Sequence, residues 1–217
     1  MPPQDEWRAV EIVGSGYDRM ADRYLASHRP GRARDRYLDR LLGLLADASD
    51  VLELGCGAGE PVTRRLTERH RVTAVDISAE QLRLAAERVP GAALLQAGML
   101  DVEFEPASFD AVAAFYAITH VPRQRHADLL ARIAAWLRPD GWLLISMGAG
   151  DNPGEVEDDW LGVPMYFSHF DAVTNQALVQ RAGFELVEAD VVEEIGPDGA
   201  PERFLWVVAR RLPGPPP

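Results

Sequence analysis

The heptapeptide Glu53–Gly59 (ELGCGAG) completes a short apolar run that begins at Asp50, and an amphipathic segment over about 61–69 follows it. A short apolar run of this kind predicts a buried strand, and the segment after it predicts a helix. Glycines between a strand and a helix permit a tight turn and let the backbone approach a ligand closely. The heptapeptide therefore predicts a strand–turn–helix unit that binds a ligand at its turn.

The rest of the chain repeats this alternation of short apolar runs and amphipathic segments. It predicts an α/β fold with a doubly wound, Rossmann-like sheet of seven mostly parallel strands and helices on both faces. The last two runs flank GPDGAPE (196–202), which is typical of a hairpin, so the last strand should be antiparallel. The predicted strands are Asp50–Leu54, Arg71–Asp76, Ala92–Gln96, Phe109–Tyr116, Trp142–Met147, Phe184–Glu194 and Arg203–Arg210. The predicted helices lie within 1–49 and over 61–69, 78–89, 123–137 and 171–182.

One domain over residues 1–212 accounts for this pattern, with a disordered proline-rich tail at 213–217. Within it we expect an N-terminal helical lid (1–49), a ligand-binding core (50–147) and a cap over the ligand side (148–171). The cap segment shows no regular periodicity and is rich in aromatic residues. Irregular segments of that length usually either cover active sites or contain regular elements that have been wrongly assigned.

The composition excludes several classes of function. The chain has 217 residues and a formal net charge of −12, and its 22 basic residues are all arginines. A chain without lysine has no Schiff-base lysine and no P-loop lysine. The excess of acids argues against nucleic acid and anionic membranes as partners. Cys56 is the single cysteine, and we find no signal peptide and no apolar run long enough to span a membrane, so we expect a cytoplasmic monomer or homodimer.

The glycine turn and Asp76 suit any cofactor that contains adenosine. Asp76 ends the next predicted strand, where a carboxylate can bind two ribose hydroxyls. Both nicotinamide dinucleotides and S-adenosylmethionine satisfy these two features. A dinucleotide fingerprint requires a third glycine at residue 60, where this chain has Glu60. A carboxylate there would repel a pyrophosphate, whereas a cationic sulfonium tolerates it, so the methyl donor is favoured.

Residues 50–147 resemble the core of the class I S-adenosylmethionine-dependent methyltransferases. ELGCGAG matches the first motif of that family, and Val75–Ser78 (VDIS) matches its acidic ribose motif. The antiparallel end of the predicted sheet is also typical of the family. Tyr17–Tyr24 (YDRMADRY) is similar to the N-terminal helix that closes over the cofactor in small bacterial members that methylate small molecules.

The resemblance implies that the enzyme binds S-adenosylmethionine and releases S-adenosylhomocysteine. The glycines would line the methionine part, Glu53 would hold the amino group indirectly, and Asp76 would bind the ribose. The family often has an acid that contacts the adenine amino group where this chain has Gly98, so adenine recognition should depend on backbone and packing. The cofactor-binding residues carried over are Tyr17, Glu53, Gly55, Cys56, Gly57, Gly59, Asp76, Ile77, Met99, Leu100 and Phe115.

The acceptor side of the reaction is less defined by the sequence. Methyl transfer chiefly requires alignment, and a base helps only where the acceptor must lose a proton. His120 follows the fourth predicted strand and His169 lies in the aromatic cap, so either is a candidate catalytic base or a structural histidine. The candidate acceptor walls are Tyr24, Tyr116, Trp160 and Tyr166.

We expect methyl transfer to a small organic acceptor, first to an oxygen of an apolar or aromatic molecule and next to nitrogen. A non-catalytic cofactor-binding protein is the alternative from another class. A nicotinamide oxidoreductase is disfavoured by Glu60 and by the absence of lysine. Acidic residues gather at 155–159, but consecutive acids usually form a solvated face, so we expect no metal.

Overall fold

The computed structural model describes residues 4–27 and 33–214. The predicted tail therefore falls partly outside the described residues, as do 1–3 and 28–32 of the predicted lid. The helices are α1 (Gln4–Ser27), α2 (Ala33–Leu44), α3 (Val62–Thr67), α4 (Ala79–Arg88), α5 (His126–Trp136) and α6 (Ala172–Arg181), with short 3₁₀ turns at Ile118–His120 (η1) and Arg123–Arg125 (η2). The strands are β1 (Asp50–Leu54), β2 (Arg71–Asp76), β3 (Ala93–Gln96), β4 (Phe109–Ala114), β5 (Leu137–Gly148), β6 (Asn152–Trp160), β7 (Val163–His169), β8 (Phe184–Ile195) and β9 (Pro201–Arg211).

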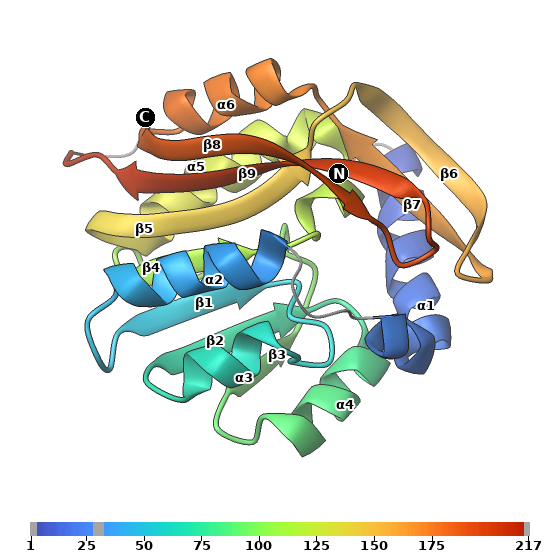
Figure 1. The fold of residues 1–217 in the computed structure, drawn as a ribbon, viewed down its shortest axis with the longest axis horizontal. Coiled ribbons are helices and arrows are strands. Elements are labelled where there is room, and N and C mark those ends of the chain that lie inside the picture. Colours follow the sequence, from blue (N-terminus) through green and yellow to red (C-terminus); the bar gives the residue numbers. More distant parts are fainter. Residues whose placement is uncertain (1–3, 28–32, 215–217) are drawn as a thin grey trace.

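A seven-stranded sheet in the order β3-β2-β1-β4-β5-β9-β8 forms the centre of the molecule (Figure 1). The pairs among β1 to β5 are parallel, whereas β9 pairs antiparallel with both β5 and β8. The last strand in the sequence is thus the antiparallel one, as predicted. The strand order reverses between β1 and β4, and a doubly wound sheet binds ligands in the crevice at such a switch point.

Each face of the sheet has its own apolar core. Side chains of β1 alternate between them, with Val51 in one cluster and Leu52 and Leu54 in the other. The Val51 cluster includes Leu38 and Leu41 of α2, and the opposite cluster includes side chains of α5 and α6. Both faces are therefore buried, which is why the parallel strands read as short continuous apolar runs.

The segment predicted to be an irregular cap is a two-stranded antiparallel hairpin, so the absence of regular structure predicted there was wrong. Residues 153–159 of β6 are exposed, which removed the apolar alternation by which a half-buried strand is identified. Leu161 and Gly162 form the turn with positive φ angles of 50° and 81°. Two such residues are the usual connection of a tight hairpin. We call β6–β7 the cap hairpin.

The boundary between the fifth helix and strand also differs from the prediction. The helix was predicted to run to Leu137 and the strand to begin at Trp142, which leaves residues 138–141 as a turn between them. Instead α5 ends at Trp136, and Leu137 already pairs with Phe109. The pairing shifts register before Trp142, and Asp140 adopts a φ of 66° within the irregular stretch. The turn residues therefore form a bulge inside β5 rather than a loop.

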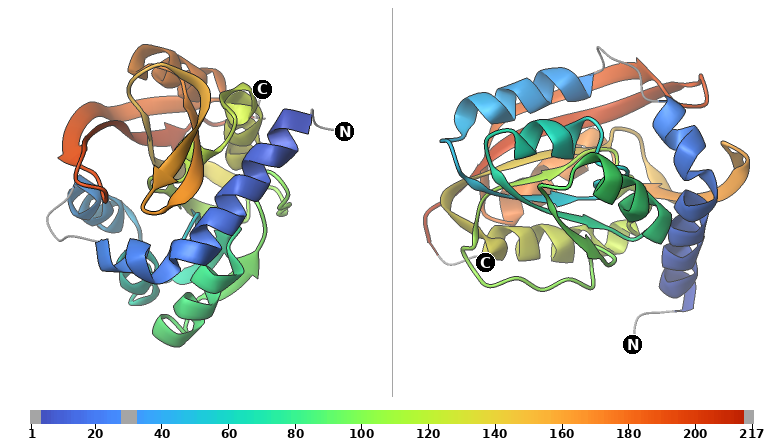
Figure 2. Two further views of the ribbon diagram at one scale, coloured as in Figure 1. Left: turned by 90° about the vertical axis from the view of Figure 1, so that its right-hand side faces the viewer. Right: turned by 90° about the horizontal axis from the view of Figure 1, so that it is seen from below.

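Helix α1 packs against both α4 and the cap hairpin, across the carboxyl end of the sheet (Figure 2). Gly16 makes the contact with β7 close: a Cβ there would lie 2.8 Å from Met165 Cε and 3.1 Å from the Pro164 carbonyl oxygen. Tyr17, Met20 and other apolar side chains of α1 share a small core with the hairpin. No helix within the described residues is long and apolar enough to cross a membrane.

Candidate active site

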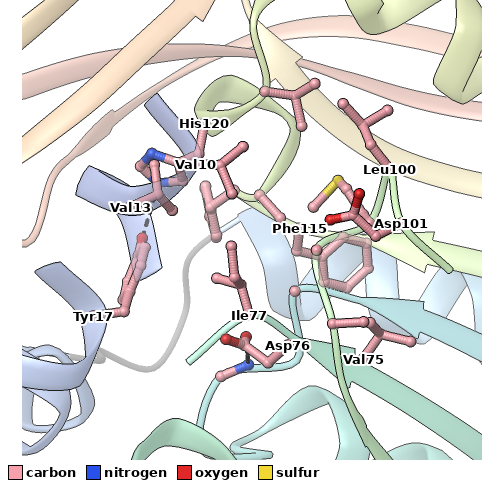
Figure 3. A pocket seen from close by; sticks show the side chains of 18 of the residues that line it. Val10, Val13, Tyr17, Val75, Asp76, Ile77, Leu100, Asp101, Phe115 and His120 are labelled. Carbon is pink, nitrogen blue, oxygen red and sulfur yellow. Dashed lines mark hydrogen bonds between the residues drawn. The ribbon is translucent and has the colours of Figure 1, made fainter. Parts of the chain in front are cut away.

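A cavity opens at the carboxyl ends of β1, β2 and β4, where an open parallel sheet places its ligands (Figure 3). It contains about 800 Å³ of empty space, part of which is open to solvent. Side chains of α1 face those of the strand ends across it. We call it the main cavity. The residues predicted to bind the cofactor that line it are Tyr17, Gly55, Gly57, Asp76, Ile77, Met99, Leu100 and Phe115.

The glycine turn borders this cavity with its backbone. Gly55 and Gly57 have φ angles of 75° and 53°, a region that other L residues rarely adopt. A Cβ on Gly55 would lie 2.4 Å from the Cβ of Ala117, so this glycine also permits the loop after β4 to approach. Gly59 does not line the cavity; a Cβ there would lie 2.6 Å from Val89 Cγ2, so this glycine permits the turn to pack closely against the end of α4. Cys56 is buried beside the turn, where burial raises the pKa of its thiol well above the usual value.

Asp76 stands at the end of β2 with its carboxyl group held by the backbone. Its Oδ2 accepts from the Gly57 N–H at 2.8 Å, and its Oδ1 accepts from the Ser78 N–H at 2.9 Å. Burial raises the pKa of this carboxyl to about 6 despite those hydrogen bonds. Each oxygen has a second lone pair, so the group can still accept hydrogen bonds from a diol.

Glu53 lies behind the turn and does not line the main cavity. Its side chain is 4% exposed, and its Oε2 accepts from the Thr63 hydroxyl at 2.6 Å. Burial, reinforced by the nearby charge of Asp76, raises the pKa of Glu53 to about 8. With that pKa Glu53 stays protonated and neutral at pH 7, so Asp76 is the buried acid beside the turn that attracts a cationic ligand.

An acid that sequence reasoning missed lies beside Gly98. A Cβ on Gly98 would lie 2.6 Å from Asp101 Oδ2, so the Asp101 carboxylate occupies the space next to this glycine. Asp101 lines the main cavity together with the apolar side chains of Ile77 and Leu100 (Figure 3). The only signal in the sequence is an acid three residues after the glycine, and the turn that brings it back became visible only in the structure.

Tyr17 of α1 and His120 of η1 meet over the cavity, although 103 positions separate them. The Tyr17 Oη lies 2.8 Å from His120 Nε2 (Figure 3). On the other side of the ring, His120 Nδ1 lies 2.9 Å from the Tyr166 carbonyl oxygen. A carbonyl oxygen only accepts, so Nδ1 carries the proton. Burial lowers the pKa of His120 to about 4, so the ring is neutral and its Nε2 accepts from the Tyr17 hydroxyl.

A smaller chamber adjoins the main cavity at His120. The two share the lining residues Tyr17, Tyr24, Tyr116 and His120, and the smaller one has about 430 Å³ of empty space, part of it open to solvent. We call it the side chamber. Trp160 of the cap hairpin lines it, as does Arg34 at the start of α2. The sequence did not single out Arg34.

Two other candidates lie outside both cavities. His169 donates its Nδ1–H to the Gly150 carbonyl oxygen at 2.7 Å, and its ring lies against Gly148. Tyr166 contributes its backbone carbonyl to His120, while its hydroxyl points toward Gly154. Alternation along β7 explains the position of Tyr166, because its neighbour Phe167 lines the side chamber and neighbouring side chains of a strand face opposite ways. In the part of the chain that the structure describes, no three His, Cys, Asp or Glu side chains converge as metal ligands, and the acids of 155–159 are exposed on β6.

The main cavity fits S-adenosylmethionine better than a dinucleotide. Among the described residues that line it, the side chains that can carry a negative charge are Asp76 and Asp101, besides tyrosines, and none is an arginine. A pyrophosphate would meet acids without a compensating cation, whereas a sulfonium and an ammonium group would be attracted. The apolar walls formed by Ile77, Leu100 and Phe115 suit a purine ring.

The sheet topology and this cavity resemble those of the class I S-adenosylmethionine-dependent methyltransferases. Residues 51–141 match a family model described as a methyltransferase domain. The chain is also 34% identical over 180 residues to 27-O-demethylrifamycin SV methyltransferase of Amycolatopsis mediterranei (strain S699), a match that covers 75% of this chain and 64% of that protein. The chain thus spans just under two thirds of the length of this curated relative.

Solved structures agree with the class. The 1,6-didemethyltoxoflavin-N1-methyltransferase of Burkholderia thailandensis, solved with 1,6-didemethyltoxoflavin and S-adenosylhomocysteine, is 25% identical, has a TM-score of 0.72, and matches over 98% of this chain and 92% of its own. The DhpI complex with S-adenosylhomocysteine is 22% identical, has a TM-score of 0.75, and matches over 95% of this chain and 98% of its own. At that identity the DhpI match shows the fold alone. The cofactor of this class is S-adenosylmethionine.

Proposed function

We propose that this protein transfers a methyl group from S-adenosylmethionine to an oxygen of a small, largely aromatic acceptor bound in the side chamber. The observation that carries the proposal is the position of His120. It is buried at the junction of the main cavity and the side chamber, with an unprotonated Nε2 directed at Tyr17. An acceptor in the side chamber would therefore lie next to a proton acceptor and next to the cofactor.

The residues of the main cavity would hold the cofactor. Asp76 would bind the ribose hydroxyls and Asp101 the adenine amino group, while the backbone of Gly55 and Gly57 would pass along the methionine part. The cofactor supplies an electrophilic methyl group: the acceptor oxygen forms the new C–O bond while the old C–S bond breaks and leaves its electron pair on sulfur. The proton released from the acceptor hydroxyl would pass to His120 Nε2, directly or through the Tyr17 hydroxyl. Such general-base assistance typically contributes about 10²–10⁴-fold in rate.

The test is turnover of phenols with S-adenosylmethionine, measured as S-adenosylhomocysteine formed. His120→Gln is expected to lower kcat by about 10²-fold or more with the affinity for S-adenosylhomocysteine retained. His169→Gln is the matched control and should leave kcat unchanged, because His169 lies outside both cavities. Because the pKa of His120 is about 4, the wild-type rate should be level above about pH 5 and fall only toward pH 4. Cofactor binding without turnover of any acceptor would instead support the non-catalytic alternative.

Transfer to nitrogen is the second candidate. The Burkholderia thailandensis structure is that of an N1-methyltransferase, and this chain matches 92% of it. An unprotonated amine needs no strong base. Turnover of amines that stays within a few-fold after His120→Gln would favour nitrogen over oxygen.

A further inference from the structure

Arg34 is a buried charge in the first turn of α2. Only 5% of the residue is exposed, and its side chain lines the side chamber. Arginine is seldom buried to this extent without partners, because removing a charge from water is costly unless it is paired. The contacts of this guanidinium therefore indicate whether a bound anion could pair with it in the chamber.

The pairing of Arg34 within the protein is weak. Its Nε lies 3.4 Å from Asp35 Oδ1, beyond the usual range of a good N–H···O hydrogen bond, and Asp35 is partly exposed. Among the residues that the structure describes, the two terminal Nη nitrogens have no hydrogen-bond or ion-pair partner. Two donor groups of a buried cation thus remain for a molecule in the chamber.

The carboxylates of Glu194 and Glu202 lie in the same region as Arg34, and the structure shows contacts of each with other residues. Glu194 accepts from the Ala33 N–H at 2.8 Å through Oε1 and from the Tyr116 hydroxyl at 2.9 Å through Oε2. Glu202 lines the chamber from β9, with its carboxyl group against Gly196, where a Cβ would lie 2.5 Å from Oε1. These acids would repel a doubly charged anion. A single carboxylate on the ligand is therefore favoured over a phosphate.

We propose that Arg34 binds a carboxylate of the methyl acceptor, which makes the substrate a small aromatic acid. This inference rests on the proposed function, because it takes the side chamber as the acceptor site. A planar guanidinium matches a carboxylate with two parallel hydrogen bonds. The ring of the acid would lie among the aromatic walls Tyr24, Trp160, Phe167 and Phe204, between Arg34 and His120.

The experiment measures binding without turnover, so its result does not depend on which atom is methylated. Calorimetric titrations with benzoate, 4-hydroxybenzoate and 3-hydroxybenzoate would be compared with titrations of the corresponding amides. Each amide has nearly the same shape and no charge, and the protein is saturated with S-adenosylhomocysteine throughout. The wild type should bind at least one carboxylate more tightly than its amide by about tenfold or more.

Arg34→Gln should bring each pair within about twofold, and Arg34→Lys should keep part of the preference. Arg40→Gln is the matched control on the same helix, where Arg40 is exposed and pairs with Glu188. Unchanged affinity for S-adenosylhomocysteine shows that each variant is folded. If Arg34→Gln does not fold, Arg34→Lys still tests the proposal. Failure of all the carboxylates to bind, equal binding of an acid and its amide, or a preference that survives Arg34→Gln would overturn the proposal. Absence of turnover with intact carboxylate preference would count against the proposed function alone.

Discussion

The main cavity and the side chamber, which we propose as the cofactor side and the acceptor side of an active site, are assembled differently. On the cofactor side, Gly55 directly follows β1, Asp76 is the last residue of β2, and Leu100 lies in the turn after β3. On the acceptor side, Tyr17, Arg34 and other residues come from α1, α2, η1, the cap hairpin and β9. The cofactor side is built by the same means at each strand, from residues at or just after its carboxyl end. The acceptor side exists only where elements distant in the sequence pack together. Acceptor specificity can therefore change through the outer elements while the cofactor side stays intact.

The largest effect is predicted for a substitution in the glycine turn on the cofactor side. Gly55→Ala places a Cβ 2.4 Å from the Ala117 Cβ at a φ of 75°. We expect a loss of about 2–5 kcal/mol in stability from strain and overpacking together, and at least about 100-fold weaker S-adenosylhomocysteine binding. Denaturant unfolding and calorimetry measure the two quantities.

The companion variant Ala117→Gly removes the clashing methyl group, so Gly55→Ala/Ala117→Gly should recover part of both losses. Gly43→Ala is the control, because a Cβ there meets nothing within 4 Å in the exposed part of α2. It should raise stability by about 0.5–1 kcal/mol. Binding that is unaffected by Gly55→Ala would show that the turn adapts, contrary to the close approach described above.

A smaller effect on the same side concerns pH. Glu53 has a folded-state pKa of about 8 against an ordinary value of 4.5, so the folded state binds the proton more tightly than the unfolded state. Its stabilising contribution is complete below about pH 4.5 and is lost as the pH rises toward 8. Asp76, with a pKa of about 6, acts in the same direction. The ligand-free protein should therefore lose stability between about pH 5 and pH 8, by an amount of the order of a few kcal/mol.

Denaturant unfolding at pH 5, 6.5 and 8 would follow this loss, with each variant measured at all three values. Glu53→Gln should flatten the dependence, because it removes the group that titrates. Glu87→Gln is the control, since Glu87 is exposed and pairs with Arg83 on α4. A wild type that becomes more stable as the pH rises would contradict the buried, protonated state of Glu53.

The smallest effect tests the acceptor side through the contact of α1 with the cap hairpin. Gly16→Val would displace α1, because its added atoms start 2.8 Å from Met165 and 3.1 Å from the Pro164 oxygen. We expect faster hydrogen exchange in α1 and an acceptor KM raised by a few-fold, with a smaller change in S-adenosylhomocysteine affinity. Ser15→Ala, at the exposed neighbouring position, should leave both values unchanged. Equal losses of cofactor and acceptor binding would show that the two sides are not separable.

Much of the fold could be predicted from the sequence because it is encoded locally. Apart from the start of β5, the seven strands of the main sheet were predicted to within two residues. The start of α4 is also local: the Ser78 hydroxyl accepts from the Gln81 N–H at 3.1 Å and caps the helix. The cap hairpin was missed because β6 is exposed and carries no alternation of apolar and polar residues. Asp101 was missed for a different reason: its relevance depends on a turn that folds it back over Gly98.

The sequence by itself determined the sheet, the glycine turn and the placement of Asp76, because each depends on residues adjacent along the chain and on the periodicity of a strand or helix. Only the tertiary structure decided that His120 and not His169 lies between the two cavities. Only the tertiary structure, likewise, brought Tyr17 within 2.8 Å of a ring 103 positions away. Contacts of that kind follow from how helices and hairpins pack on the sheet, which no local pattern of residues specifies.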